Sequence, residues 1–226
     1  MDDASDLNTR MAAVADRLRA IVDELDAHPD IDLKTGRVHF PVPDAFLKIQ
    51  EDRYNIRFGP GARAFYNQCN GCDIEWVHRG EPYIDGRIQI IPHTQVLAGW
   101  SAETPEWHND LWFDFMTPEQ QAPLKKLKPF DYPGYDDSCC ACFIEQDGVI
   151  DDALCFHSVD NGRLPLHIGL ERYLELLLQT RGMAFFARFT EPVDKYMAPT
   201  RDTFIANLAR LFPDVDPAPF KPPEAT

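Results

Sequence analysis

Two cysteine pairs have the residue type that a structural zinc site requires. Cys69 and Cys72 are separated by two residues, the spacing of a zinc knuckle, and Cys140 and Cys142 lie further along the chain. If residues 139–144 form a strand, Cys140 and Cys142 share one of its faces. The second cluster is irregularly spaced, and the long aromatic-rich segment between the pairs should fold without metal. We therefore expect no metal and no cofactor, and a site made of these four thiolates stays open as the alternative.

A second candidate for chemistry is the pair Cys155 and His157. Residues two apart on a strand point to the same face, so the imidazole would lie beside the thiol. A nucleophilic thiol needs a nearby cation to lower its pKa, yet the segment 129–162 contains eight Asp and Glu and no Lys or Arg. An acidic environment raises a thiol pKa. We interpret both as ordinary strand residues, and a Cys/His metal-dependent enzyme stays an alternative function.

Two pairs of adjacent aspartates in the same segment resemble acid–base or divalent-metal sites. Adjacent strand residues point to opposite faces, so neither pair converges locally, and both pairs lie beside turns, where Asp is common for backbone reasons. The acidic run from Asp131 to Asp160 is therefore either a solvated rim or a face that contacts a partner. The candidate partner-binding residues are Asp136, Asp137, Glu145, Asp147, Asp151 and Asp152.

The overall charge restricts the class of partner. The 226 residues include 22 Lys and Arg and 37 Asp and Glu, for a formal net charge of −15. A nucleic-acid binder would need cations facing phosphates, whereas this charge favours solubility and attraction to a basic partner. No apolar run approaches the roughly 18 residues of a membrane helix, and the acidic start Met1-Asp2-Asp3 is not typical of a secretory signal. We expect a cytoplasmic protein whose six cysteines are free thiols, with neither nucleic acid nor membrane as a partner.

The elements that must position these residues begin with a helix. Ser5 is its predicted N-cap, and His28-Pro29 ends it, because proline disfavours helical geometry in the preceding residue. Its apolar residues alternate spacings of four and three: Leu7, Met11, Val14, Leu18, Ile21 and Leu25. We predict an amphipathic helix packed on its own domain, with a dimerising coiled coil as the alternative.

The central part of the chain alternates helical and strand patterns. A short strand at 37–40 precedes a helix from Asp44 and a second helix at 62–68, which ends at the turn Asn70-Gly71 because Asn-Gly favours positive φ. Asp147-Gly148 predicts a hairpin turn, as does Asn161-Gly162. The predicted strands are 74–77, 87–91, 111–116, 139–144 and 153–159. The other predicted segments are a helical turn at 94–100, an exposed insertion at 105–110 and a polar connector at 118–129.

The last third of the chain is predicted to be helical. One helix has Leu170, Leu174, Leu177 and Leu178 on one face and ends at Arg181-Gly182, and a final helix starts near Thr200 and buries Phe204, Leu208 and Leu211. Helices at both ends with strands between them indicate an α+β fold. We predict three parts: an amphipathic helix at 1–30, an α+β domain at 31–212, and a Pro-rich tail at 213–226 that is extended or disordered.

The order of several short motifs resembles the SUKH superfamily, which includes a yeast cell-wall-synthesis regulator and many bacterial toxin-immunity proteins. The similarity covers residues 40 to 185. The segments that carry it are Pro43-Asp44-Ala45-Phe46-Leu47, Ile49-Gln50-Glu51, Gly61 to Tyr66, Asn67-Gln68-Cys69-Asn70-Gly71, Trp76, the strand Gly86 to Ile90, and a closing helix from Leu164 to Leu178.

The resemblance implies a twisted, mostly antiparallel sheet with helices packed around it, and a protein that binds rather than catalyses. It implies no catalytic residue, and it gives Asn70, Gly71 and Trp76 structural roles. The expected function is therefore that of an immunity protein that neutralises a cognate toxin with a basic surface by direct binding. A regulatory scaffold of the same family is the alternative, and both monomer and dimer are compatible with the sequence.

Overall fold

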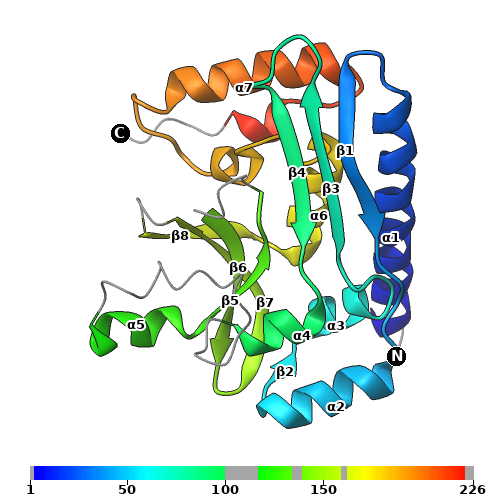
Figure 1. Ribbon diagram of the computed structural model, residues 1–226. Coiled ribbons are helices and arrows are strands. Elements are labelled where there is room, and N and C mark those ends of the chain that lie inside the picture. Colours follow the sequence, from blue (N-terminus) through cyan, green and yellow to red (C-terminus); the bar gives the residue numbers. More distant parts are fainter. Residues whose placement is uncertain (1–2, 100–116, 134–138, 159–161, 222–226) are drawn as a thin grey trace.

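One bent sheet of eight strands organises the part of the chain that the computed structural model describes, residues 3–99, 117–133, 139–158 and 162–221 (Figure 1). The strands are β1 (Ile31–Val38), β2 (Arg57–Phe58), β3 (Cys72–His78), β4 (Asp85–Ile90), β5 (Leu127–Asp131), β6 (Cys139–Gln146), β7 (Val149–Ser158) and β8 (Gly162–Gly169). Their order is β1-β3-β4-β5-β6-β7-β2, with β8 paired to β7. Every pairing is antiparallel except that of β2 with β7, so the predicted α+β class and mostly antiparallel sheet are confirmed.

The sheet bends where β4 meets β5. Strands β3 and β4 pair along their whole lengths, whereas β4 and β5 are joined in register only at Ile90 and Asp131. Figure 1 shows β1, β3 and β4 side by side on one half of the molecule and β5 to β8 on the other. The sheet therefore consists of two groups of strands, β1-β3-β4 and β5 to β8 with β2, joined at a single residue pair.

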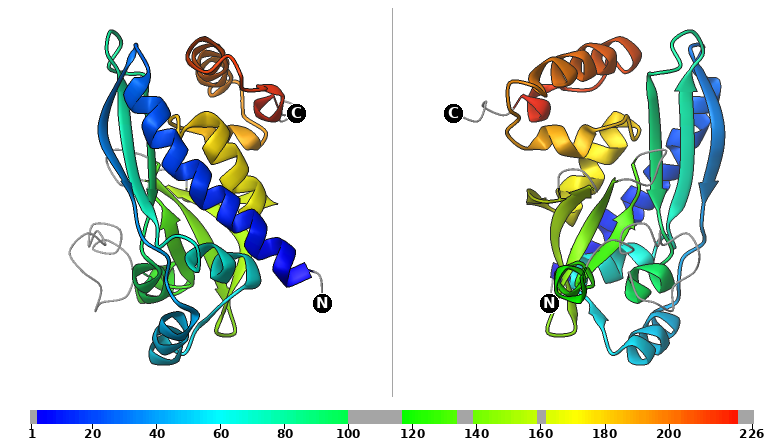
Figure 2. Two further views of the ribbon diagram at one scale, coloured as in Figure 1. Left: turned by 90° about the vertical axis from the view of Figure 1, so that its right-hand side faces the viewer. Right: turned by 60° about the vertical axis from the view of Figure 1, so that its left-hand side comes forward.

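Helices cover one face of the sheet and both of its ends. They are α1 (Asp3–Ala27), α2 (Asp44–Tyr54), α3 (Pro60–Tyr66), α4 (His93–Ala98), α5 (Pro118–Leu124), α6 (Leu170–Thr180) and α7 (Ala198–Leu211), with the 3-10 helices η2 (Phe186–Thr190) and η3 (Ala218–Phe220). Helices α1 and α6 cross the same face, as the left view of Figure 2 shows. Helix α2 lies at the lower end of the molecule and α7 at the upper end (Figure 1).

The apolar stripe of α1 packs into the common core. Met11, Leu18, Ile21 and Leu25 are buried, and Leu7 and Val14 are partly buried against the same cluster. The prediction of an amphipathic helix packed on its own domain is therefore confirmed. The same core cluster also contains residues of the sheet and of α6.

Two predicted turns have the backbone geometry that their residues favour. Asp147 and Gly148 both adopt positive φ, 50° and 78°, as a tight hairpin between β6 and β7 requires. Arg181 and Gly182 have φ of 51° and 70° and end α6, with Gly182 N donating to Leu177 O. Both predictions are confirmed.

The strand predicted at 37–40 is wrong in extent, because β1 runs from Ile31 to Val38. Gly36 lies inside the strand. A Cβ at Gly36 would lie 2.6 Å from Val22 Cγ1 of α1, so the glycine allows the helix to approach the sheet closely.

The polar connector predicted at 118–129 is also wrong. Thr117 forms a capping box with Gln120 that starts α5, and every residue of β5 is buried. The prediction failed because β5 contains Lys128, and a lysine is typical of an exposed segment. Its ammonium reaches Leu97 O at 3.3 Å and Glu145 Oε2 at 3.6 Å, so the charge is buried with partners.

Two predictions at the C-terminal end need correction. The helix expected from Leu164 begins only at Leu170, because the preceding residues form β8, an edge strand in which Pro165 is tolerated. The tail predicted to be extended or disordered packs instead as far as Lys221. Phe220 is fully buried, with its ring 5.2 Å from that of Phe204. Burial of this aromatic ring holds the tail in place.

Three further predictions lie outside the described residues. They are the exposed insertion at 105–110, the strand at 111–116 and the first residue of the Asn161-Gly162 turn.

Candidate protein-binding surface

The turn at Asn70 and Gly71 joins α3 to the sheet and holds several segments together. Gly71 has φ of +90°, and a Cβ there would lie 2.1 Å from Ile90 O, so only glycine fits. Asn70 N donates to Phe40 O, and Asn70 Oδ1 accepts from the His93 backbone N at 3.1 Å. The turn therefore fixes the start of α4 beside the segment that leaves β1.

Trp76 has a comparable position inside the sheet. It lies opposite Gly86 on β4, where a Cβ would come within 2.4 Å of the indole ring. Its Nε1 donates to Arg181 O at 2.7 Å, and its ring meets Phe212 edge-on. Trp76 thus connects the sheet to the end of α6.

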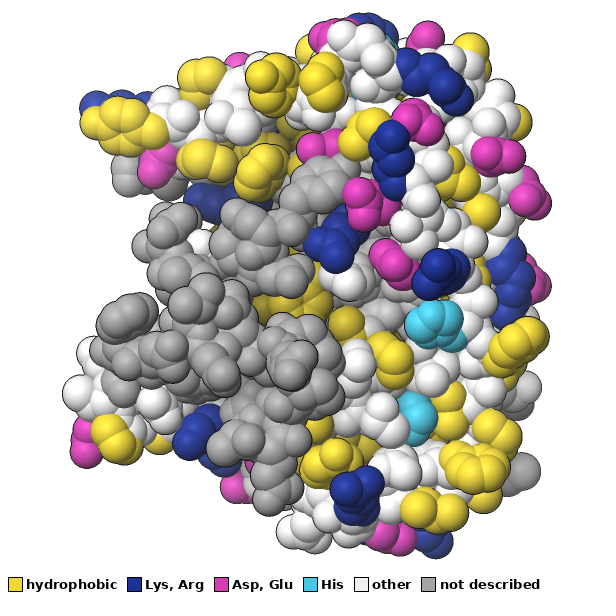
Figure 3. Space-filling view, viewed as in Figure 1, with side chains coloured by type: hydrophobic (Ala, Val, Ile, Leu, Met, Phe, Trp, Pro, Cys, Tyr) yellow, Lys and Arg dark blue, Asp and Glu magenta, His cyan; other side chains and the backbone are white. Residues whose placement is uncertain are grey.

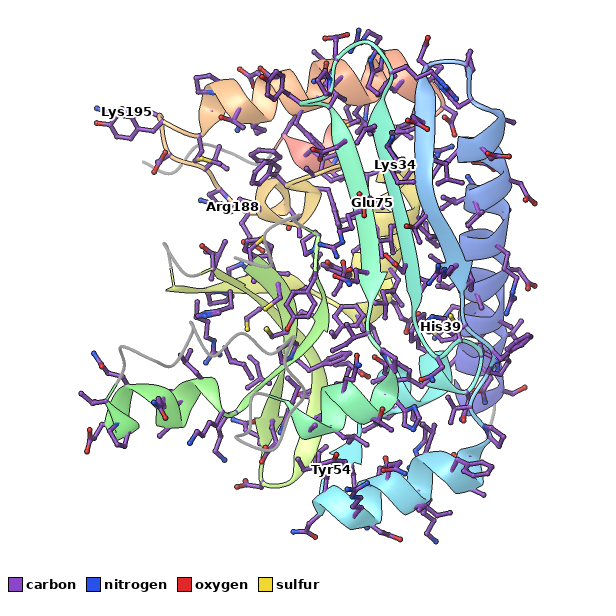
Figure 4. The ribbon with its side chains drawn as sticks, viewed as in Figure 1. Lys34, His39, Tyr54, Glu75, Arg188 and Lys195 are labelled. Carbon is purple, nitrogen blue, oxygen red and sulfur yellow. The ribbon has the colours of Figure 1, made fainter. Side chains whose placement is uncertain are left out.

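A groove opens next to the Asn70 turn. Its volume is about 780 Å³, within the range typical of ligand pockets. The segment that follows β1 forms one wall, and α2 with the start of α4 forms the other. The lining residues are Gly36, Arg37, Val38, His39, Phe40, Pro41, Val42, Pro43, Phe46, Gln50, Asn70, His93 and Thr94. Figure 4 labels His39, which lies on the side of the N-terminal end of α2, and Tyr54, the last residue of that helix.

Large apolar side chains are exposed along and beside this groove. Phe40 is 89% exposed, Phe46 61% and Ile49 58%. Figure 3 shows hydrophobic side chains gathered over α2 and the adjoining segment, at the lower right of the view. We call the groove together with Phe40, Phe46 and Ile49 the groove face. Clustered exposed apolar residues of this kind are typical of protein-interaction sites.

The two histidines of the groove are fixed through Asn70. His93 Nδ1 lies 2.8 Å from Asn70 Oδ1, and His39 Nδ1 lies 3.2 Å from Asn70 O. Both oxygens accept, so each Nδ1 carries a proton. Burial lowers the pKa of His93, which favours its neutral form.

The predicted acidic residues do not form one continuous patch. Asp136 and Asp137 lie outside the described residues. Glu145 is half-buried, with Lys128 Nζ at 3.6 Å and Lys126 Nζ at 3.9 Å. Asp147 and Asp151 are exposed near the tip of the β6–β7 hairpin.

Asp152 has a structural partner that the sequence did not suggest. Its two carboxylate oxygens accept from Gly61 N at 2.9 Å and Ala62 N at 3.0 Å, at the N-terminus of α3. The carboxylate therefore caps a helix some 90 residues away and compensates the exposed amides there. Asp152 is thus partly buried, and both of its carboxylate oxygens have partners within the domain.

The cysteines considered for zinc are all buried, Cys69 in the turn before β3 and the other three in strands β3 and β6. Cys69 Sγ donates to Gly71 O at 3.1 Å, and Cys140 and Cys142 have their sulfur atoms 3.3 Å apart. Burial raises the pKa of Cys72 and Cys142 well above the ordinary thiol value. Among the described residues, no three His, Cys, Asp or Glu side chains are arranged to hold a metal ion.

Cys155 and His157 are both buried in β7. The hydrogen bond with Cys142 and burial raise the pKa of the Cys155 thiol, the opposite of what a nucleophile needs. Burial lowers the pKa of His157 to about 4, so its imidazole is neutral at pH 7. This pair behaves as part of the core.

Sequence reasoning missed the groove face. The available signal was in α2, where Phe46 and Ile49 are spaced three apart while Leu47 lies on a different side of the helix. Leu47 and Glu51 are the buried residues, so one apolar stripe had to remain outside. Only the packing of α2 decides which stripe is buried.

Comparison with known proteins adds no relative. No family model matches the chain, and no curated protein or solved structure is significantly similar to it. Among the described residues, no helix combines the length and the apolar character that a membrane-spanning segment needs.

Proposed function

We propose that this chain is a non-enzymatic protein-binding domain that neutralises a cognate bacterial toxin by direct contact. The observation that carries the proposal is the groove face. Three large apolar side chains are exposed within one ten-residue stretch beside a groove, and exposing them to water is unfavourable unless a partner covers them. Aromatic anchors next to a concavity are the usual centre of a protein interface.

The toxin as partner rests on the resemblance to the SUKH superfamily and on charge. A net charge of −15 attracts a basic protein over long range and raises the rate of encounter. Asp147 and Asp151 on the β6–β7 hairpin are the carboxylates that we assign to basic side chains of the toxin. The hairpin tip lies beside the far end of α2, because Arg57 N donates to Gly148 O across the β2–β7 pairing. One partner can therefore contact both the groove face and the hairpin.

A scaffold that regulates several proteins would use the same surface, and only the number of its partners would distinguish it from an immunity protein. For a Cys/His enzyme, the thiols would have to react from the interior of the sheet with raised pKa values. We therefore place function on the surface rather than on these thiols.

Co-expression with the toxin encoded by the adjacent gene tests the proposal. We expect the wild-type protein to protect the cell, and the variant Phe40→Asp/Phe46→Asp to lose protection while it remains folded. Tyr83→Asp is the matched control, because Tyr83 is 96% exposed in the β3–β4 turn at the opposite end of the molecule. This control should protect as well as wild type.

The two possible failures are distinct. If wild-type protein gives no protection against the toxin, the immunity function is wrong. If the Phe40→Asp/Phe46→Asp variant protects fully, the function stands and the groove face is not the contact surface.

A further inference from the structure

We infer that the groove binds a partner segment that combines an apolar anchor with a carboxylate. This inference rests on the proposed function only in requiring a protein partner; it does not require that partner to be a toxin. It assigns the groove a local charge preference opposite to that of the whole molecule.

The composition of the groove wall is the first observation. The chain has 37 Asp and Glu, yet none of the residues that line the groove is acidic. The lining contains Arg37 and two histidines. Asp73 lies opposite Arg37 in the β1–β3 register but does not line the groove. The groove lining therefore has no carboxylate and carries the Arg37 guanidinium, in a strongly acidic protein, and charge complementarity favours an anionic occupant.

The two sides of α2 provide the second observation. Phe46, Ile49, Gln50 and Arg53 follow the spacing i, i+3, i+4, i+7, so they form one stripe along the helix, on the groove side. The acidic residues of α2 lie off this stripe. Arg63 forms ion pairs with Asp44 and Glu51, and Arg57 pairs with Asp52 at 2.6 Å.

The stripe therefore continues the groove with two apolar side chains and ends in a guanidinium. Arg53 lies over the ring of Tyr54, with its Cζ 5.6 Å from the ring centroid, and it is exposed to solvent. An extended or helical segment lying along α2 would meet Phe46 and Ile49 first and then Arg53. Arginine binds carboxylates in two-pronged geometry, which suits this position.

Hydrogen-bonding groups in the groove agree with the same occupant. Asn70 Oδ1 already accepts from the backbone N and Nδ1 of His93, so the amide NH₂ of Asn70 is the group that it offers to a ligand. An NH₂ group donates, and a carboxylate only accepts. The polar base of the groove and its cationic rim therefore favour the same chemistry.

Selection from a random library of short linear peptides on the intact protein tests the inference. We expect captured peptides to share an apolar residue flanked by Asp or Glu, and to be lost on the Phe40→Asp/Phe46→Asp variant. The selected peptide is then titrated by fluorescence anisotropy. Arg37→Glu/Arg53→Glu should weaken its binding by about ten-fold or more, because like charges then face each other.

Lys48→Glu is the matched control, since Lys48 belongs to the same helix but lies off the groove-side stripe. It should change the affinity by less than about two-fold, as expected of an exposed charge with no ionic partner in the complex. Equal losses of binding free energy for each reversed charge in the control and in the arginine variant would overturn the inference, because they would report net charge alone. Captured peptides that are neutral or basic would overturn it directly.

Sedimentation equilibrium tests whether the groove instead binds a second copy of this chain. A dimer that Phe40→Asp/Phe46→Asp dissociates would show that the groove face is a self-association surface and would also overturn the inference. The peptide titration is independent of the toxin assay. A protein that selects acidic peptides but fails to protect cells refutes only the immunity function, and the reverse result refutes only the groove chemistry.

Discussion

The β6–β7 hairpin and the groove face place their side chains in opposite environments. The hairpin buries cysteines and a histidine, residues that suggest chemistry in a sequence, and it changes their pKa values in directions that make them less reactive at neutral pH. The groove face exposes Phe40, Phe46 and Ile49, residues that suggest a core.

The difference shows that residue type and exposure are independent guides in this fold. Small thiols and a neutral imidazole fill the interior because they pack well between strands. Exposed aromatic residues also occur elsewhere, as at Tyr83 and Tyr196, but on the groove face two of them lie together with Ile49 beside a groove, the arrangement typical of an interaction site. Residue type and exposure therefore give opposite indications in these two regions.

The same substitution on the two regions gives the largest contrast. Phe143 of β6 is fully buried, with its ring 4.8 Å from that of Phe130, so Phe143→Ala should lower the free energy of unfolding by about 3–5 kcal/mol. Phe40→Ala should change it by less than about 0.5 kcal/mol, because the side chain is exposed. Urea denaturation of the two variants measures both values. A large loss in Phe40→Ala would break the comparison.

Acid should destabilise the protein through His157. Its pKa is about 4 in the folded protein and about 6.5 when unfolded, so the unfolded chain binds the additional proton between these pH values. Stability is therefore lost as the pH falls, by roughly 2–3 kcal/mol between pH 7 and pH 4.5 at about 1.4 kcal/mol for each pKa unit. Urea denaturation of wild type and of His157→Gln at both pH values isolates this contribution.

Wild type has to be compared with His157→Gln because Asp131 titrates in the same pH range. Burial raises its pKa to about 6, although Tyr173 donates a hydrogen bond to its carboxylate at 2.6 Å. Its contribution has the opposite sign, because stability then decreases as the pH rises from about 4 to about 6. If wild type and His157→Gln lose the same free energy on acidification, His157 is not neutral in the fold.

The smallest expected difference in the free energy of unfolding is between variants of two adjacent aspartates. Asp152→Ala removes the cap of α3 and should lower the free energy of unfolding by about 1–2 kcal/mol. Asp151→Ala should change it by less than about 0.5 kcal/mol, because Asp151 is exposed. Thermal unfolding of the pair measures this, and equal losses would refute the division of the hairpin into structural and surface carboxylates.

Local rules predicted the elements whose causes are local. The apolar stripe of α1, the hairpin turn at Asp147-Gly148 and the end of α6 at Arg181-Gly182 all depend on neighbouring residues, and all are present. The class of fold followed from their order.

The misses depended on partners far along the chain. Lys128 can be buried in β5 because its ammonium contacts Leu97 O and Glu145, and no local pattern contains those contacts. Asp152 became a helix cap through α3, and Phe220 is held by the ring of Phe204. The groove face was missed for the same reason, since the packing of Leu47 and Glu51 alone decides which side of α2 stays outside.

Helix α1 has a consequence for synthesis on the ribosome. It is made before α6 and α7, yet it packs against α6, His28 Nε2 meets Leu211 O at 3.2 Å, and Arg181 pairs with Glu24 at 3.5 Å. Translation at about 5–20 residues per second separates these partners by roughly 10–40 s. During that interval the stripe of Met11, Leu18, Ile21 and Leu25 has no residue of α6 to pack against, so the last part of its burial has to wait for the C-terminal third of the chain.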